Sequence, residues 1–407
     1  MDSVQVSDSA LERKVIALVA AVQFVHIVDF MMVMPLGPDF AKALGIRVSH
    51  LGVVAGAYTL AAAVSGIICS FFIDRLDRKI ALLISVFGLG IGTASGAWAE
   101  DFHSLLLARV FAGAFGGPAA SVALALISDV VPPARRGAAL GTAMMSFSLA
   151  SILGVPMGLE LARWGTWQTP FLVVGAMGVL VSFAIYYLLP SMKGHLANYD
   201  YNRSTFKAHV ALLSQRVVLL SYLVTFSLMM SGFLVFPNIA AYVQLNLNFP
   251  RAEMGRLYLV GGLISFAVMR YVGKLVDRFG STSLFLIGTI GFWIGLFGGF
   301  LGDPPMLGAY GIFFVFMLFG TIRNISANTL TSKVPKPADR AGFMSLQSAV
   351  QHSATAFGGI VSSRLLVTTS DGKLEGFLAL VVASSILMLV AAICVMQLQK
   401  RVVTSSY

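Results

Sequence analysis

Charged residues are scarce in this 407-residue chain. Lys, Arg, Asp and Glu together make up 11% of it, whereas 57% of the residues are hydrophobic. Soluble domains carry about 25% charged residues, and a water-soluble core of this length could not hide so much apolar surface. A lipid bilayer can cover it, because the bilayer is itself apolar. The composition therefore excludes an ordinary soluble domain and predicts a membrane protein.

Several kinds of chemistry are also missing. The two cysteines, Cys69 and Cys394, lie inside apolar runs and do not form a metal-ligand spacing. The sequence has no P-loop that would indicate ATP coupling and no nucleophile–base arrangement that would indicate an enzyme. The net charge of +10 is spread over short gaps between apolar runs without a basic, aromatic-rich cluster, which argues against nucleic-acid binding. We expect no metal and no cofactor.

What the chain does contain is twelve apolar runs. A helix needs about 20 residues to cross a hydrocarbon core ~30 Å thick. Backbone polar groups in lipid must be satisfied within the segment, so we predict that all twelve are helices. Their approximate bounds are 15–37, 50–72, 80–98, 103–128, 138–162, 168–189, 216–243, 253–275, 282–301, 306–331, 341–367 and 376–398.

Lys and Arg are distributed unevenly over the gaps between these runs. Nineteen of the 28 lie in the two terminal segments and the even-numbered gaps, seven lie in the odd-numbered gaps, and Arg109 and Arg323 lie within spans. Positively charged loops stay preferentially in the cytoplasm. We therefore expect a multi-pass protein with both termini in the cytoplasm.

The longest polar gap divides the spans six and six. We expect an N-terminal bundle over 1–189, a cytoplasmic linker over 190–215 and a C-terminal bundle over 216–407. The halves match at an offset of 203, which aligns Asp74-Arg75 with Asp277-Arg278 and Val131-Pro132 with Val334-Pro335. Internal repeats of this kind place a transporter's binding site at their interface, near the bilayer midplane.

A charged turn follows the second span and recurs after the eighth. The first copy contains Asp74, Arg75 and Arg78, and the second reads Gly273-Lys274-Leu275-Val276-Asp277-Arg278-Phe279-Gly280. Both resemble motif A of the major facilitator superfamily, although the first has Ser70 and Asp77 where the motif has glycine. We expect Asp129, at the inner end of the fourth span, to pair with Arg75 or Arg78. The two copies are interpreted as gating elements, with plain positive-inside anchoring as the alternative.

Two further segments extend the resemblance. Arg109-Val110-Phe111-Ala112-Gly113 is similar to motif B, whose arginine is linked to proton transfer, and Gly154, Pro156 and Gly158 form part of the antiporter-associated motif C. Residues 24–38 resemble the first helix of the bacterial drug/proton antiporter and sugar-efflux branch. The resemblance implies an all-α membrane protein of the MFS fold, with two six-helix bundles related by pseudo-two-fold symmetry. It also implies a bacterial inner membrane and a monomer.

Asp29 and Arg109 are the ionisable residues of greatest interest within the spans. An ionisable group inside the bilayer costs ~2.5–3.5 kcal/mol on insertion scales, so it is a functional hypothesis by default. By position they lie at matching depth in the first and fourth spans. A carboxylate balanced between desolvation and a nearby guanidinium can load and release a proton. We predict that Asp29 and Arg109 couple protons, with His26 one turn away extending the path; a permanent structural ion pair is the alternative.

Arg323 has no acidic partner within the spans of the second half. It either snorkels to the cytoplasmic surface or meets an anionic group of the substrate. The surrounding polar residues predict a substrate-binding cavity, with helix–helix contact as the alternative. These residues are Asn324, Asn328, Gln347, Gln351 and His352.

The leading interpretation is a proton-coupled secondary active transporter that works by alternating access. We expect it to export a small organic molecule of the drug, sugar or metabolite type, anionic ones included. The sequence leaves two alternatives: a proton-coupled importer of a vitamin or, through its methionines, of copper, and a non-transporting membrane receptor. The expected partners are the substrate, protons and membrane lipid.

Overall fold

The computed structural model describes residues 9–194, 196, 210–302, 304–335 and 340–404. The first half consists of helices α1 (Ser9–Met32), α2 (Gly37–Ala43), α3 (Leu51–Ser70), α4 (Arg78–Ser95), α5 (Phe102–Val130), α6 (Pro133–Leu149), α7 (Val155–Trp164) and α8 (Thr169–Leu188). The second consists of α10 (Arg216–Phe233), α11 (Phe236–Leu245), α12 (Met254–Phe279), α13 (Ser281–Phe300), α14 (Ala309–Thr331), α15 (Arg340–Leu365) and α16 (Phe377–Thr404). Two short strands, β1 (Val367–Thr368) and β2 (Leu374–Glu375), pair antiparallel between α15 and α16.

Eleven helical segments among the described residues are long and apolar enough to cross a membrane. The remaining predicted span corresponds to α15, whose 26 residues exceed the ~20 needed. It is more polar than the others because it carries Gln347, Gln351, His352 and several serines. The twelve predicted spans are thus all helical, and α15 is the span that amino-acid composition identifies least clearly.

Three predicted spans are not continuous α-helices. A turn separates α1 from α2, a second break separates α10 from α11, and the π-helical turn η4 (Ala150–Gly154) joins α6 to α7. Proline fits the first turn of a helix but not its interior, and α2, α7 and α11 each carry proline at their first or second position. Proline therefore marks the helix that follows each of these breaks.

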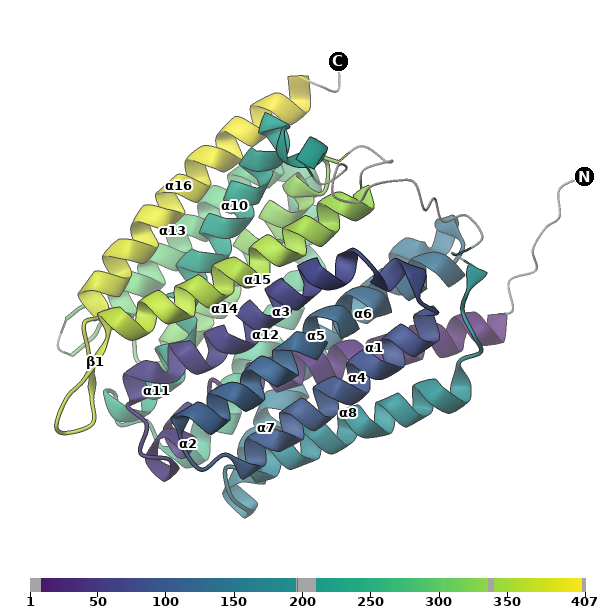
Figure 1. Ribbon diagram of the computed structural model, residues 1–407. Helices are drawn as coiled ribbons and strands as arrows, with labels where there is room; N and C mark the ends of the chain where they lie inside the picture. The colour runs from purple at the N-terminus through teal and green to yellow at the C-terminus, as the bar shows by residue number, and fades with distance from the viewer. Residues whose placement is uncertain (1–8, 195, 197–209, 303, 336–339, 405–407) are drawn as a thin grey trace, which may run out of the picture.

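The helices form two bundles that lie side by side, the first at lower right and the second at upper left in Figure 1. Between them, α3 packs along α15, and α12 packs along α7 and η4. Small residues allow these close approaches, as transmembrane packing requires. A side chain at Gly52 of α3 would meet the backbone of Gly359 in α15, and one at Gly262 of α12 would meet the backbone of η4.

Among the described residues, the hydrogen bonds that join α3 and its N-terminal turn to α15 and β1 lie at one end of the molecule. We call the end where α8 finishes and α10 starts the linker end, and the opposite one the distal end; α1 begins and α16 finishes at the linker end (Figure 1). Near the distal end the backbone N–H of Ser49 donates to Thr368 Oγ1 at 3.1 Å, and that of Val53 donates to Ser363 Oγ at 3.1 Å. Toward the linker end, the described parts of α3 and α15 share no hydrogen bond or ion pair. The predicted linker, 190–215, lies largely outside the described residues.

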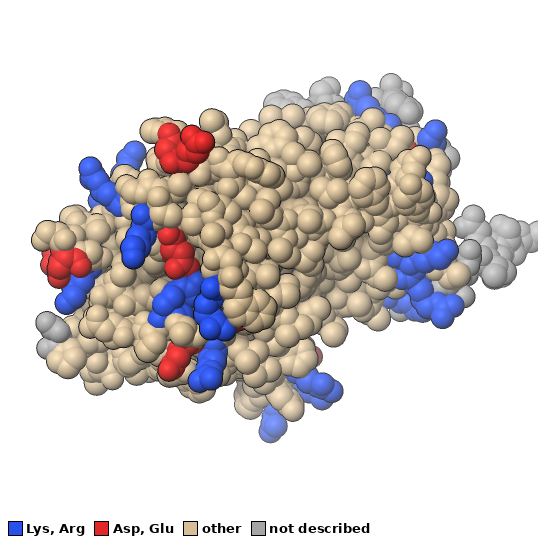
Figure 2. Space-filling model, turned by 90° about the horizontal axis from the view of Figure 1, so that it is seen from below, with Lys and Arg blue, Asp and Glu red and all other residues tan. Residues whose placement is uncertain are grey.

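The surface fits a membrane-spanning body. Figure 2 shows a broad uncharged band between two charged ends, with blue side chains dominating the linker end and mixed charges at the distal end. Large apolar side chains that a soluble protein would bury are exposed on the band, among them Ile84, Leu180, Ile290, Ile386 and Leu389. The chain is therefore a multi-pass membrane protein.

Candidate functional site

A buried ion pair lies at the centre of the first bundle. Arg109 Nη1 of α5 donates to Asp29 Oδ1 of α1 at 2.7 Å, and the two side chains are 1% and 0% exposed. The Arg109 guanidinium also lies 4.5 Å from the ring centroid of Tyr58 in α3. α3 and α5 can bring these groups together because Gly113 has no side chain, whose first atom would lie 2.1 Å from Tyr58 O. Asp29 and Arg109, expected at the same depth in their spans, thus form a direct ion pair.

Several polar atoms around this pair have no hydrogen-bond partner. Within the described structure, both ring nitrogens of His26 are buried and unpaired, and neither Asp29 Oδ2 nor the Tyr58 hydroxyl, which are also buried, forms a short, well-aligned hydrogen bond. The His26 and Tyr58 rings lie 6.1 Å apart, and the Tyr58 hydroxyl faces the Asp29 carboxylate as a loose side-chain hydrogen-bond partner. Buried polar groups are normally satisfied, so a cluster of unpaired ones marks a place with a role beyond packing.

His352 brings the second bundle to this cluster. It lies on α15, close enough to His26 for the two imidazoles to influence each other electrostatically across the interface between the bundles. Its Nδ1 is 2.9 Å from the backbone carbonyl of Ser348 one turn earlier, which orients the ring. The structure therefore brings together His26, Asp29, Arg109 and His352, which the sequence assigned to separate proton and substrate groups.

The other polar residues of α14 and α15 do not form one group. Gln347 is buried and its Nε2 donates to Thr331 Oγ1 at 3.2 Å, so it joins α15 to α14 and serves as helix–helix contact. Asn324 is half-buried, and Asn328 and Gln351 are exposed. None of these three side chains forms a hydrogen bond with another described residue.

Arg323 is buried without an anionic partner. Its side chain is 3% exposed, its Nε is unpaired, and it forms no ion pair with the residues that the structure describes. The guanidinium lies 4.1 Å from the ring centroid of Phe292, which is eleven residues, or ~16 Å, into α13 from the linker end. Because the Arg323 Cα is eight residues, or ~12 Å, from the same end of α14, the side chain extends away from that end. The snorkelling alternative is therefore wrong.

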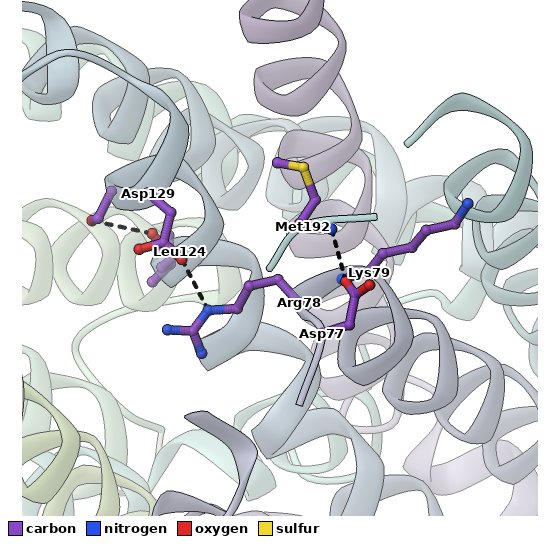
Figure 3. A network of polar contacts seen from close by, with 7 residues as sticks. Asp77, Arg78, Lys79, Leu124, Asp129 and Met192 are labelled. Atoms are coloured by element: carbon purple, nitrogen blue, oxygen red, sulfur yellow. Dashed lines mark hydrogen bonds and ion pairs between the residues drawn. The ribbon is translucent and has the colours of Figure 1, made fainter. Parts of the chain in front are cut away.

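The first motif A copy forms a polar network at the start of α4 (Figure 3). Arg78 Nε donates to Asp129 Oδ2 of α5 at 2.9 Å, so Arg78 rather than the exposed Arg75 makes the expected contact. This pair lies within the first bundle and does not bridge the two. The Asp74 side chain lies outside the described part of the structure, so the prediction for it stays a prediction.

Asp77 occupies a position where the motif has glycine, and its carboxylate accepts hydrogen bonds that glycine could not. Its carboxylate caps α4 through the Lys79 N–H and accepts from the Met192 N–H, each at 2.9 Å (Figure 3). It also accepts from Ser191 Oγ at 2.6 Å. Burial raises the pKa of this carboxyl, but the three hydrogen bonds outweigh burial and hold the pKa below its ordinary value. Asp77 thus fastens the segment after α8 to the start of α4.

The second motif A copy and the motif C residues behave differently. Asp277 and Arg278 are exposed at the end of α12 and form no ion pair with described residues. Gly154 lies where a side chain would meet Val28 of α1 at 2.3 Å, and Gly158 faces Met32 of the same helix. Together with Pro156, which begins α7, they let the fifth span pack closely against the helix that carries Asp29.

Sequence reasoning missed two contacts that shape the site. Tyr58 under Arg109 was not foreseen, because an aromatic residue in an apolar helix gives no signal of its partner. At the distal end, Arg251 of η6 (Arg251–Glu253) pairs with Asp39 of α2 and links the two bundles. Both residues lie between predicted spans, and only their opposite charges indicated that they could pair.

The described residues contain no group of three or more His, Cys, Asp or Glu side chains that could hold a metal ion. Of the methionines that made copper a candidate, Met31 accepts a hydrogen bond from Ser151 Oγ at 3.7 Å. It therefore has a packing partner in η4 and lies beside the interface with α12.

Comparison with known proteins agrees with this architecture. The model of the Major Facilitator Superfamily matches residues 19–362, so the chain belongs to this family of membrane transporters. It is 26% identical to a multi-drug resistance efflux pump PmrA homolog of Lactococcus lactis over 75% of this chain and 76% of that one. It is 24% identical to a chloramphenicol resistance protein of Streptomyces lividans over 92% and 93%.

Two further similarities are to sugar transporters, one found by sequence and one by structure. A probable sugar efflux transporter of Helicobacter acinonychis is 25% identical over 61% of this chain and 63% of its own length. The solved structure of a D-xylose-proton symporter shares the fold with a TM-score of 0.74 at 15% identity, over 93% of this chain and 97% of that one. Membership of a transporter family argues against the receptor alternative and against an enzyme.

Proposed function

We propose that this protein is a proton-coupled antiporter that exports a small organic molecule across the bacterial inner membrane. The excess of Lys and Arg at the linker end supports a cytoplasmic location for this end and for both termini. The bundles, over 1–189 and 216–407, are proposed to rock about a central site as a monomer. We assign the structure to an inward-facing state, because in this orientation the hydrogen bonds of Ser49 and Val53 to Thr368 and Ser363 lie on the outer side.

The observation that carries the proposal is the weakly held Oδ2 of Asp29. One oxygen of this carboxylate is held by Arg109, and the other is buried with only a loose contact to the Tyr58 hydroxyl. A purely structural pair would gain from satisfying both oxygens, since an unmet acceptor costs about 1–3 kcal/mol.

The surrounding groups supply a route for the proton. His26 and the Tyr58 hydroxyl border the same point of α5, because a side chain on Gly116 would meet both, and His352 lies near His26 on the other bundle. When Asp29 is protonated, its hold on Arg109 weakens, and the guanidinium relies more on the Tyr58 ring. Loading of the proton is thus coupled to the contact between α1, α3 and α5, and α3 lines the interface with α15.

Export is favoured over import by the likeness to efflux proteins. The relatives include a multi-drug efflux pump, a sugar efflux transporter and a chloramphenicol resistance protein. The motif C glycines point the same way, because they are associated with antiporters. The proposed substrates are therefore drug-, sugar- or metabolite-like molecules, including anionic ones.

Inside-out membrane vesicles test this proposal. An acid interior should drive accumulation of at least one of three probes, chloramphenicol, D-xylose or benzoate, in vesicles with the wild-type protein. Asp29→Asn should abolish this accumulation while the protein stays folded. Accumulation by the variant at the wild-type rate, or no gradient-driven accumulation of any probe, counts against the proposal.

A further inference from the structure

Arg323 lies in an environment built from three helices of the second bundle. Its backbone is fixed against α13, because a side chain on Gly288 would come within 3.2 Å of the Arg323 Cα. Its guanidinium stacks on Phe292 one turn further along α13, at 4.1 Å. Stacking covers a face of the planar group and leaves the N–H groups along its edge free to bind in the plane.

The edge of the guanidinium faces a glycine on α10. A side-chain carbon added to Gly232 would lie 3.8 Å from Arg323 Nη2, and no other atom outside its own helix environment would come within 4 Å. A side-chain carbon at Gly232 would therefore be in ordinary van der Waals contact with one cationic nitrogen and with no other described atom. A carboxylate attached at this point lies within reach of the guanidinium.

The internal repeat gives this space a counterpart in the first bundle. Asp29 plus the offset of 203 falls at Gly232, on the equivalent first helix of the second half. In the first bundle an arginine stacked on an aromatic ring binds the carboxylate at this position, at 2.7 Å. In the second bundle an arginine stacked on an aromatic ring reaches the same position, and the carboxylate is missing.

An unpaired guanidinium is costly in this place. Arginine stays charged throughout the accessible pH range, and a buried charge is normally paired or hydrogen-bonded. Arg323 has five N–H donors and no acceptor among the described residues. The arrangement thus leaves a site of defined charge and geometry for an anion.

We propose that the space between Gly232 and Arg323 binds a carboxylate or similar anionic group of the transported molecule. The substrate then supplies to the second bundle the carboxylate that Asp29 supplies to the first. Binding neutralises Arg323 and ties α10 to α14, so an empty and a loaded carrier differ in the charge of their central region. This inference rests on the proposed function only in taking the space to lie on the transport pathway.

The test uses the purified full-length protein in lipid nanodiscs, with benzoate as the anionic probe and benzamide as its neutral isostere. The wild type should bind benzoate at least about tenfold more tightly than benzamide, as expected for hydrogen bonds to a charged group. Arg323→Gln should remove this preference, and Arg323→Lys should retain part of it, because the charge remains but the planar fork is lost.

Gly232→Asp is the sharper variant, because it restores the carboxylate that the repeat lacks. The new side chain should pair with Arg323, raise the thermal unfolding midpoint above that of Gly232→Ala, and weaken benzoate binding at least about tenfold relative to Gly232→Ala. Gly308→Asp is the matched control: it adds a carboxylate at the start of α14, where nothing lies within 4 Å, and should leave binding unchanged.

Three results would overturn the proposal: equal binding of benzoate and benzamide by the wild type, undiminished benzoate binding by Arg323→Gln, or equal binding by Gly232→Asp and Gly232→Ala. Asp29→Asn separates this inference from proton coupling. Benzoate binding that persists in this variant, together with lost gradient-driven transport, supports both. Intact benzoate selectivity with pH-driven transport that does not depend on Asp29 would leave the subsite standing and contradict only the coupling.

Discussion

Gly52→Ala should open the distal side of the protein. A side-chain carbon at this position of α3 would lie 2.2 Å from the backbone carbonyl oxygen of Gly359 in α15, whereas ordinary contact begins at 3.4 Å. The two helices must therefore separate locally by about 1.2 Å, the difference between these distances. Overpacking of this kind costs about 1–3 kcal/mol. The ratio of distally closed to distally open molecules should fall about 5- to 150-fold.

Distances between spin labels measure this ratio. Arg47 and Val367 are exposed on opposite sides of the distal interface, and cysteines at both can be labelled in a protein that lacks Cys69 and Cys394. The variant should populate longer distances than the wild type.

The matched control for this experiment is Gly66→Ala in the same helix. Nothing lies within 4 Å of a side chain at Gly66, so the wild-type distribution should persist. Identical distributions for Gly52→Ala and Gly66→Ala would refute the assignment of the distal contact as a closed gate.

Three other changes test separate parts of the structure. Asp39→Asn removes the partly exposed pair with Arg251 and should shift the same label distances toward opening by about 1 kcal/mol or less, with no shift if the pair is incidental. Arg109→Met leaves the Asp29 carboxylate buried and unpaired, and should cost about 3–5 kcal/mol in unfolding experiments. Adding Asp29→Asn to it should restore most of this loss, and additive losses would contradict a coupled pair. Asp77→Asn should lower the thermal midpoint at neutral pH. Because the folded pKa of Asp77 is depressed, its contribution is full above the unfolded pKa of 3.8 and is lost only as the pH falls through the lower folded pKa, where the difference between variant and wild type should vanish. A difference that persists below the folded pKa would contradict this account.

Chain positions and the family resemblance together predicted several contacts. Depth within the spans indicated the pairing of Asp29 with Arg109, because the resemblance places the first and fourth helices together and residues at the same level of neighbouring helices can meet. The charge of Asp129 at a helix end indicated a partner in motif A, and the structure selects Arg78.

Other features depend on tertiary packing and could not be derived from periodicity or charge. The breaks in the first and seventh spans follow from proline positions that also fit continuous kinked helices. The direction of the Arg323 side chain is set by Phe292 and Gly232, which are distant in sequence and carry no charge. The role of Gln347 as a contact to Thr331 was one of two readings that a polar face allows, and only the packing of α14 on α15 decides between them.

The central claim is that protonation of Asp29 controls the conformation of the carrier. Spin labels at positions 47 and 367 test it without a substrate, by following the distal opening while the pH is varied. The account predicts that the wild-type ratio of closed to open molecules changes with pH, and that Asp29→Asn holds one ratio at every pH. A pH response in Asp29→Asn equal to that of the wild type would contradict the account.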